Sequence, residues 1–238
     1  MLSREDFRSA LEAARDEWHC KNHPFFTSWA AGTLSKDAMK AYCQQHYNFV
    51  SNASRYAGIM YGMCDWWDAR QLFLENLNEE EDPKERHVDK LARFGMALGM
   101  DLNESRGAPD LPTTAALKDY ILNTILLRGT LHGTALLIIG LESQVPDLYR
   151  PIVPALRDVY GFADEDIEFF LLHIEADVEH GDHGFQIVLD HTHDEKTQFD
   201  LVETVRQTAM KRWFYMDGLW LQHVEGREWF PARVEGDG

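Results

Sequence analysis

The sequence predicts an all-α protein. Apolar residues recur at helical spacing along most of the chain, as at Phe7, Leu11 and Ala14. Alternating apolar and polar runs of the kind that form half-buried strands are scarce. No internal repeat of about 20 to 50 residues is visible, which argues against a solenoid. We therefore expect a bundle of about seven helices in one domain.

The first half of the chain carries clear signals for where helices start and stop. Ser3 followed by Asp6 has the outline of a capping box and predicts a first helix that ends near the His23-Pro24 turn. A second, long helix is expected from Lys36 to Cys64, because no proline interrupts this stretch and aromatic residues recur along it.

The next stretch, residues 68–98, also favours a helix, except at Pro83, which removes an internal hydrogen bond and predicts a kink or a break. Residues 101–112 contain glycine and prolines and are expected to form a loop. A buried core helix should follow and end near Glu142. Three further helices are expected at about 154–160, 164–189 and 197–221. The predicted domain spans residues 1–224, and a loosely ordered tail spans 225–238.

Composition excludes some classes of partner. Of the 238 residues, 45% are hydrophobic, which is enough for a continuous core. The formal net charge of −17 argues against nucleic acid, because binding to phosphates requires clustered Lys and Arg. The three cysteines are irregularly spaced, unlike a secreted disulfide framework, and no leader segment is recognised. We expect a cytoplasmic protein.

The most apolar stretch, residues 121–141, is expected to be a core helix and not a membrane span. It contains Asn123, Arg128 and His132, which would be costly in lipid. Arg128 could anchor a substrate carboxylate, although a structural ion pair explains it equally well.

The sharpest motif is HIEADVEH, in which His173, Asp177 and His180 stand at positions i, i+4 and i+7 of a predicted helix. At about 100° per residue, their side chains fall within an arc of about 60° and share one face. The neighbouring aromatic residues indicate that this helix is mostly buried. Two imidazoles and a carboxylate in such a place need a metal or one another. A metal site and a buried hydrogen-bonded network are the two interpretations.

A second candidate lies in the acidic run NEEEDPKERH. Glu80 and His87 are seven residues apart and would share a helix face if the helix continued through Pro83. Glu79 or Glu81 could take the place of Glu80, and a solvated acidic turn is the plain alternative.

The third candidate, Glu142, ends the apolar run LLIIGL. The helix dipole disfavours a negative charge at that end, so a positive group should compensate it. A surface carboxylate at a frayed helix end is the alternative.

Together these segments supply six candidate metal ligands on three helical stretches: Glu80, His87, Glu142, His173, Asp177 and His180. Helical bundles hold two irons with such carboxylates and imidazoles, commonly through paired Glu-x-x-His repeats. That repeat is absent here, because Lys84 and Phe170 stand three residues before His87 and His173. The ferritin-type arrangement is therefore not expected.

This ligand order, together with the segment HPFFTSWAAGTLS at 23–35, resembles the haem-oxygenase-like di-iron oxidases, which include CADD-like and pyrroloquinoline-quinone-synthase-like proteins. The resemblance implies a seven-helix bundle, often a homodimer. It also implies that six ligands hold two Fe(II) ions, which use O2 to oxidise a small carboxylate substrate, with an external electron donor where the reaction needs one. An amino acid is the expected substrate, to be cleaved or rearranged, for example to a nitrile.

The branches of this family offer alternatives. One branch makes p-aminobenzoate from its own side chains, and the chain resembles it at Tyr42 but has Phe26 and Ile152 where that branch places a tyrosine and a lysine. Fatty-acid decarboxylation is another alternative. A cofactorless enzyme or a partner-binding protein on the same fold remains a further possibility, although a full ligand set favours the metal-dependent reaction.

Overall fold

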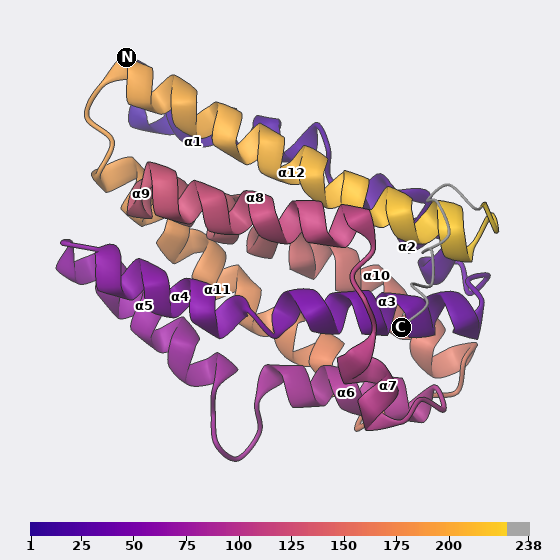
Figure 1. Cartoon of the computed structure of the whole chain (residues 1–238). Helices are drawn as coiled ribbons and strands as arrows, with labels where there is room; N and C mark the ends of the chain where they lie inside the picture. Colours follow the sequence, from indigo (N-terminus) through magenta and orange to yellow (C-terminus); the bar gives the residue numbers. More distant parts are fainter. Residues whose placement is uncertain (228–238) are drawn as a thin grey trace, which may run out of the picture.

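A computed structural model describes residues 1–227, apart from the side chains of 105–107 and 176–180. Most of the predicted tail, residues 228–238, lies outside the described part of the chain. Within that part every regular element is helical, which confirms the predicted all-α class (Figure 1). The helices of the expected seven-helix bundle are divided into more segments than the sequence suggested.

The helices are numbered in chain order. The first six are α1 (Arg4–Asp16), α2 (Pro24–Ala30), α3 (Lys36–Val50), α4 (Ala53–Met63), α5 (Trp67–Glu80) and α6 (His87–Ala97). The next six are α7 (Leu102–Gly107), α8 (Pro112–Arg128), α9 (Thr130–Thr134), α10 (Val145–Asp158), α11 (Glu168–Asp190) and α12 (Glu195–His223). Two 3₁₀ turns, η1 (Cys20–Asn22) and η3 (Glu142–Gln144), and a π-helical segment, η2 (Ala135–Leu141), complete the described structure.

The longest helices form the frame of the bundle. Helix α12 packs against α1 on one side and against α8 and η2 on the other, while α11 packs against α10 and η2. Helices α4 and α5 pair at one end of the molecule (Figure 1). Helix α1 begins as predicted, because the Ser3 side chain accepts a hydrogen bond from the Asp6 backbone N–H, and Phe7, Leu11 and Ala14 are buried.

The single helix expected from Lys36 to Cys64 is divided into α3 and α4. Ser51 and Asn52 both donate side-chain hydrogen bonds to the Asn48 carbonyl, at 3.3 and 2.9 Å. These side chains compete for a carbonyl that would otherwise accept the next helical hydrogen bond. The sequence offered no proline or glycine here, so the break was missed.

The predicted break at Pro83 is present, and it separates α5 from α6. Residues 81–86 form a turn in which the Asp82 side chain accepts a hydrogen bond from the Lys84 backbone N–H. The expected loop at 101–112 instead contains the short helix α7, because Asp101 and Glu104 form a complete capping box that the composition of the segment concealed.

The core helix expected to end near Glu142 is not continuous. It is interrupted at Gly129, which has a φ of 80° that glycine adopts without steric cost and other residues adopt only with strain. The chain then continues as α9 and η2. Each π-helical hydrogen bond spans one more residue than an α-helical bond, and such segments often occur at functional sites. Residues upstream and downstream of η2 therefore do not keep the angular relation of a regular helix.

Two glycines let η2 approach its neighbours closely. A Cβ atom at Gly140 would lie 2.7 Å from Thr208 Cγ2 on α12, and one at Gly184 of α11 would lie 2.3 Å from Ile138 Cγ2. Both distances are far below van der Waals contact. The absence of a side chain at these positions sets the spacing between η2, α11 and α12.

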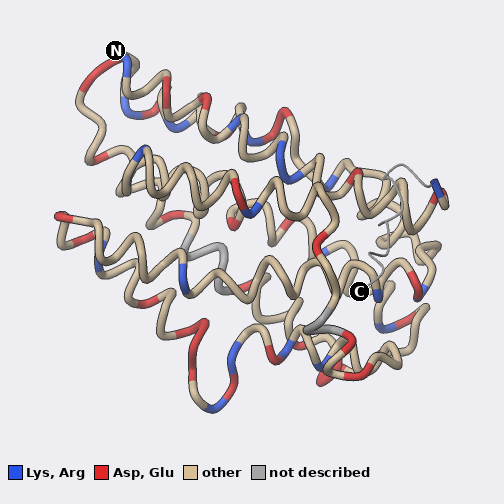
Figure 2. The backbone as a smooth tube through the Cα atoms, viewed as in Figure 1, with Lys and Arg blue, Asp and Glu red and all other residues tan. Residues whose placement is uncertain are grey.

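Charge is spread over the whole molecule. Figure 2 shows Asp and Glu along most helices, with Lys and Arg interspersed among them. No helix in the described part of the chain is both long enough and apolar enough to span a membrane.

We predict that Gly184→Ala destabilises the metal-free protein by about 1–3 kcal/mol, because the new methyl group overlaps the branched, buried side chain of Ile138. Gly181→Ala on the same helix is the control, since its nearest neighbour would be Ser143 Cβ at an ordinary 3.5 Å. That control should be neutral or gain up to about 1 kcal/mol from helix propensity. Urea unfolding followed by circular dichroism measures both. Equal stability of the two variants would show that the contact at Gly184 is not a constraint.

Candidate metal centre

A mostly apolar cavity opens among α3, α4, α5, η2, α10 and α11, with about 760 Å³ not filled by protein atoms. Its apolar wall includes Phe49, Leu137 and Phe169. Four of the six predicted ligands line it: Glu80, His87, Glu142 and His173. Asp177 and His180 follow His173 on α11, but their side chains lie outside the described residues.

Three of these residues meet in one place. Ligand atoms of Glu80, His87 and His173 all lie within 4.8 Å of one another. The reason given from the sequence for pairing Glu80 with His87 was wrong, because they do not share a helix face. Glu80 is the last residue of α5 and His87 is the first residue of α6, and the turn at 81–86 folds the two ends together.

Hydrogen bonding leaves the two imidazoles suited to metal ligation. His173 Nδ1 donates to the Phe169 carbonyl at 2.7 Å, which makes Nε2 the nitrogen that would bind a metal in the neutral ring. His87 is buried, and its Nδ1 forms no hydrogen bond with any described residue although Glu80 Oε1 lies 3.3 Å away. A buried ring nitrogen in this condition is well placed to take a metal ion as its partner.

The neighbouring glutamates divide into two groups. Glu81 accepts a hydrogen bond from the Ser54 hydroxyl at 2.6 Å and does not line the cavity that holds Glu80. Glu79 does line that cavity. The position of Glu80 beside both histidines supports its selection among the three.

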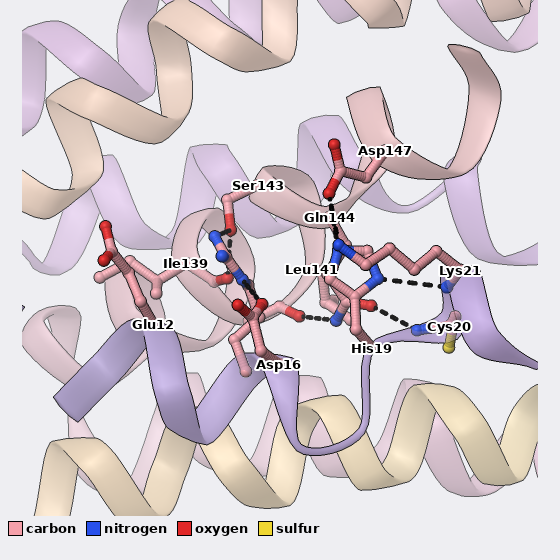
Figure 3. A network of polar contacts seen from close by, with 12 residues as sticks. Glu12, Asp16, His19, Cys20, Lys21, Ile139, Leu141, Ser143, Gln144 and Asp147 are labelled. Atoms are coloured by element: carbon pink, nitrogen blue, oxygen red, sulfur yellow. Dashed lines mark hydrogen bonds and ion pairs between the residues drawn. The ribbon is translucent and has the colours of Figure 1, made fainter. Parts of the chain in front are cut away.

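Glu142 is positioned by the turn that follows η2. The Ser143 hydroxyl donates to the Ile139 carbonyl, and the Gln144 amide donates to the Gly140 carbonyl, both at 2.6 Å (Figure 3). The side-chain oxygen of Gln144 in turn accepts the Cys20 backbone N–H at 3.0 Å. These bonds satisfy carbonyls at the end of η2 and tie the turn to η1.

A positive group stands at this helix end, as the sequence led us to expect. Arg212 of α12 is 6% exposed and donates from Nη1 to the Leu141 carbonyl, next to Glu142 in the chain. Its position deep in the bundle was not predicted, because the Lys211-Arg212 pair resembles an ordinary solvated stretch of helix.

The sequence also gave no sign of a row of hydrogen-bonded, buried side chains at the wall of the cavity. The hydroxyls of Tyr42 and Tyr149 are 2.9 Å apart, and the Tyr149 hydroxyl is 3.2 Å from His46 Nε2. Burial, with smaller effects of Arg212 and His173, lowers the pKa of His46 well below its usual value. His46 is therefore neutral near pH 7.

Arg128, in contrast, has no place at the site. It donates to the Thr204 hydroxyl at 2.8 Å and does not line the cavity. The sequence predicted a positive group near Glu142, but it did not show that Arg212 is the residue in that position.

The donor set suits iron. Imidazole nitrogens and carboxylate oxygens together are the ligands of non-haem iron and of catalytic zinc sites, whereas structural zinc sites favour thiolates and calcium sites are built from oxygen alone. All three cysteines are buried and free, and none lines the cavity.

The model of a family described as an iron-containing redox enzyme matches residues 40–213. The chain belongs to this family. The chain is similar to a 4-aminobenzoate synthase of Chlamydia muridarum, with 30% identity over 176 residues, 74% of each chain. A 4-aminobenzoate synthase of Nitrosomonas europaea is 25% identical over 234 residues, 92% of each chain.

The fold of this iron-containing redox enzyme also agrees with the resemblance found in its sequence. A solved structure from Shewanella denitrificans, a domain of unknown function with a heme oxygenase-like fold, superposes with a TM-score of 0.77. The match covers 93% of this chain and 94% of that one at 15% identity. The haem-oxygenase-like architecture is thereby confirmed.

We predict that the protein loses stability as the pH falls from about 6.5 to 4, partly through His19. His19 is buried behind the Glu142 turn, and its Nδ1 accepts the Lys21 backbone N–H at 3.1 Å (Figure 3). Burial lowers its pKa from 6.5 to about 4. Between pH 6.5 and 4, His19 is therefore protonated in the unfolded chain but mostly neutral in the folded chain. The free energy of unfolding falls over this range by an amount on the order of 1–3 kcal/mol.

The matched variant is His19→Asn, whose side-chain oxygen can accept the same N–H but cannot titrate. Urea unfolding at pH 7, 5.5 and 4.5 should show a shallower decline for His19→Asn than for the wild type. Parallel declines would mean that His19 does not contribute.

Proposed function

We propose that the protein is an O2-dependent di-iron oxidase that acts on a small carboxylate substrate. The observation that carries the proposal is the convergence of Glu80, His87 and His173 at the wall of an apolar cavity. Glu142 lines the same cavity, and Asp177 and His180 complete the proposed set of six ligands. Bound iron would supply the reduction of O2 and the oxidation of the substrate.

The residues around the site have separable roles. Glu80 and Glu142 would offset the charge of the metal ions, while His87 and His173 would offer neutral nitrogen ligands. The Phe169 carbonyl holds the His173 ring in one tautomer. The apolar wall of the cavity would lower the local dielectric, which strengthens each electrostatic contact made beside it.

An amino acid is the substrate that we propose within the carboxylate class, and a fatty acid is the alternative. A homodimer and an external electron donor belong to the same proposal.

A second candidate is synthesis of 4-aminobenzoate. It is supported by the names of the similar bacterial proteins and by the buried Tyr42, whose hydroxyl is paired with that of Tyr149. Against it, Phe26 and Ile152 are both buried apolar residues at the positions where that branch is expected to place a tyrosine and a lysine.

We expect Glu80→Ala, His87→Ala and His173→Ala each to lower the Fe(II) bound per chain while helical content stays close to wild type. The controls are Glu75→Ala on α5 and His183→Ala on α11, two exposed residues that do not line the cavity. Anaerobic equilibrium dialysis against Fe(II) measures the stoichiometry, with two per chain expected for the wild type and both controls. Two irons in all three cavity variants would show that the ligand assignment is wrong.

The reaction is tested by adding O2 to the anaerobic Fe(II) protein with a panel of amino acids and fatty acids. We expect O2 uptake that one substrate accelerates and that a chelator abolishes. Turnover in the presence of chelator would favour a cofactorless enzyme, and release of 4-aminobenzoate without added substrate would favour the second candidate. Two bound irons without O2 uptake would favour a binding protein on the same fold.

A further inference from the structure

Arg212 is a buried cation that forms no ion pair with a carboxylate of the described residues. Its side chain lines the cavity of the candidate metal centre and is 6% exposed. Among the described residues, no aspartate or glutamate forms an ion pair with its guanidinium, and the Leu141 carbonyl is the acceptor it is seen to use. A guanidinium has five N–H donors, so most of its capacity is left for another acceptor.

An isolated buried charge is costly, and proteins normally pair it. Lys90 of α6, another buried cation, shows the usual arrangement. Its ammonium group forms ion pairs with both Glu85 and Glu168. A guanidinium is a permanent charge, so the anion that Arg212 lacks among the described residues is expected from a ligand of the cavity.

His46 supplies a second unused polar atom on the same cavity. It is 4% exposed, and its Nδ1 has no hydrogen-bond partner among the described residues. Its Nε2 lies 3.2 Å from the Tyr149 hydroxyl, which is itself paired with the Tyr42 hydroxyl. When Tyr149 donates to Nε2, the neutral ring carries its proton on Nδ1, which is then a donor without an acceptor.

We propose that Arg212 and His46 form a subsite that binds the carboxylate of the substrate. A guanidinium matches a carboxylate with two parallel hydrogen bonds, and the imidazole N–H can add a third. The apolar wall near Phe49, Val145 and Phe169 would cover the rest of the molecule. The ligand class is thus a monocarboxylate with an apolar or aromatic body.

Glu80, His87 and His173 line the same cavity, so a molecule held by its carboxylate at Arg212 lies within the chamber that contains the candidate metal ligands. The inference deepens the proposed function and rests on it for the reaction. Binding of the carboxylate does not depend on the proposed function, because neither Arg212 nor His46 belongs to the proposed set of metal ligands.

The test compares each carboxylate with its uncharged amide. Binding of L-phenylalanine against L-phenylalaninamide, and of octanoate against octanamide, is measured by isothermal titration calorimetry. The protein is kept in EDTA so that a metal ion cannot be the source of a preference for carboxylates. At least one carboxylate should bind roughly tenfold or more tightly than its amide, the range given by hydrogen bonds to charged groups.

Arg212→Gln should abolish this preference, and Arg212→Lys should retain part of it, because a lysine keeps the charge but not the paired donors. His46→Phe should weaken carboxylate binding roughly fivefold. The control is Arg206→Gln, on the same helix, whose guanidinium is paired with Glu17 and Glu203 at the surface. Circular dichroism establishes that each variant is folded.

The proposal is overturned if neither carboxylate is preferred over its amide, or if the preference persists in Arg212→Gln. Should Arg212→Gln fail to fold, an undiminished preference in Arg212→Lys together with an unaffected His46→Phe would also overturn it. If carboxylates are preferred in EDTA but the protein binds no Fe(II), the result would support the carboxylate subsite and contradict the proposed di-iron oxidase function.

Discussion

The close packing of η2 against α11 and α12 is the constraint on which the site depends. Gly140 and Gly184 allow backbone and side chains to come nearer than any residue with a Cβ would permit. Because η2 is held at this distance, Glu142 at its end and His173 on α11 reach the same cavity. The same packing brings Arg212 of α12 against the Leu141 carbonyl. A small change in the spacing of these three elements would move groups on all sides of the cavity.

The interior around the cavity is unusual in the balance of its polar groups. Most buried polar atoms in folded proteins have partners. Here Arg212 has no anionic partner among the described residues, and single nitrogens of His46 and His87 have no hydrogen bond there. All three residues line the same cavity. Their position on one cavity supports the proposal that this cavity binds a ligand.

Much of the fold was readable from the sequence, because helical periodicity, the Ser3 cap and Pro83 are local signals. The break at Ser51 and Asn52 was not readable, since it depends on side chains that bond to one nearby carbonyl. The π-helical geometry of η2 was also hidden, because an unbroken apolar run is compatible with either kind of helix.

The candidate site was predictable as a set of residue types more than as a geometry. The structure places Glu80, His87, Glu142 and His173 on one cavity, and their role as metal ligands stays a prediction. The helix does not continue through Pro83, so Glu80 and His87 share no helix face, and tertiary packing brings the two helix ends together instead. Arg212 and His46 were missed for a related reason. Their burial is created by contacts between distant segments, and nothing in their immediate sequence indicates it.

The turn between α5 and α6 has a consequence for how related sites should be sought. Within a regular helix, inserting one residue rotates everything downstream by about 100° and would carry one ligand away from the other. Glu80 and His87 instead end one helix and begin the next, so the turn at 81–86 can absorb a change of length while both helix ends stay in place. Insertions and deletions are therefore tolerable between these two ligands. A search pattern that demands a fixed interval between the glutamate and the histidine would miss any homologue whose turn differs in length.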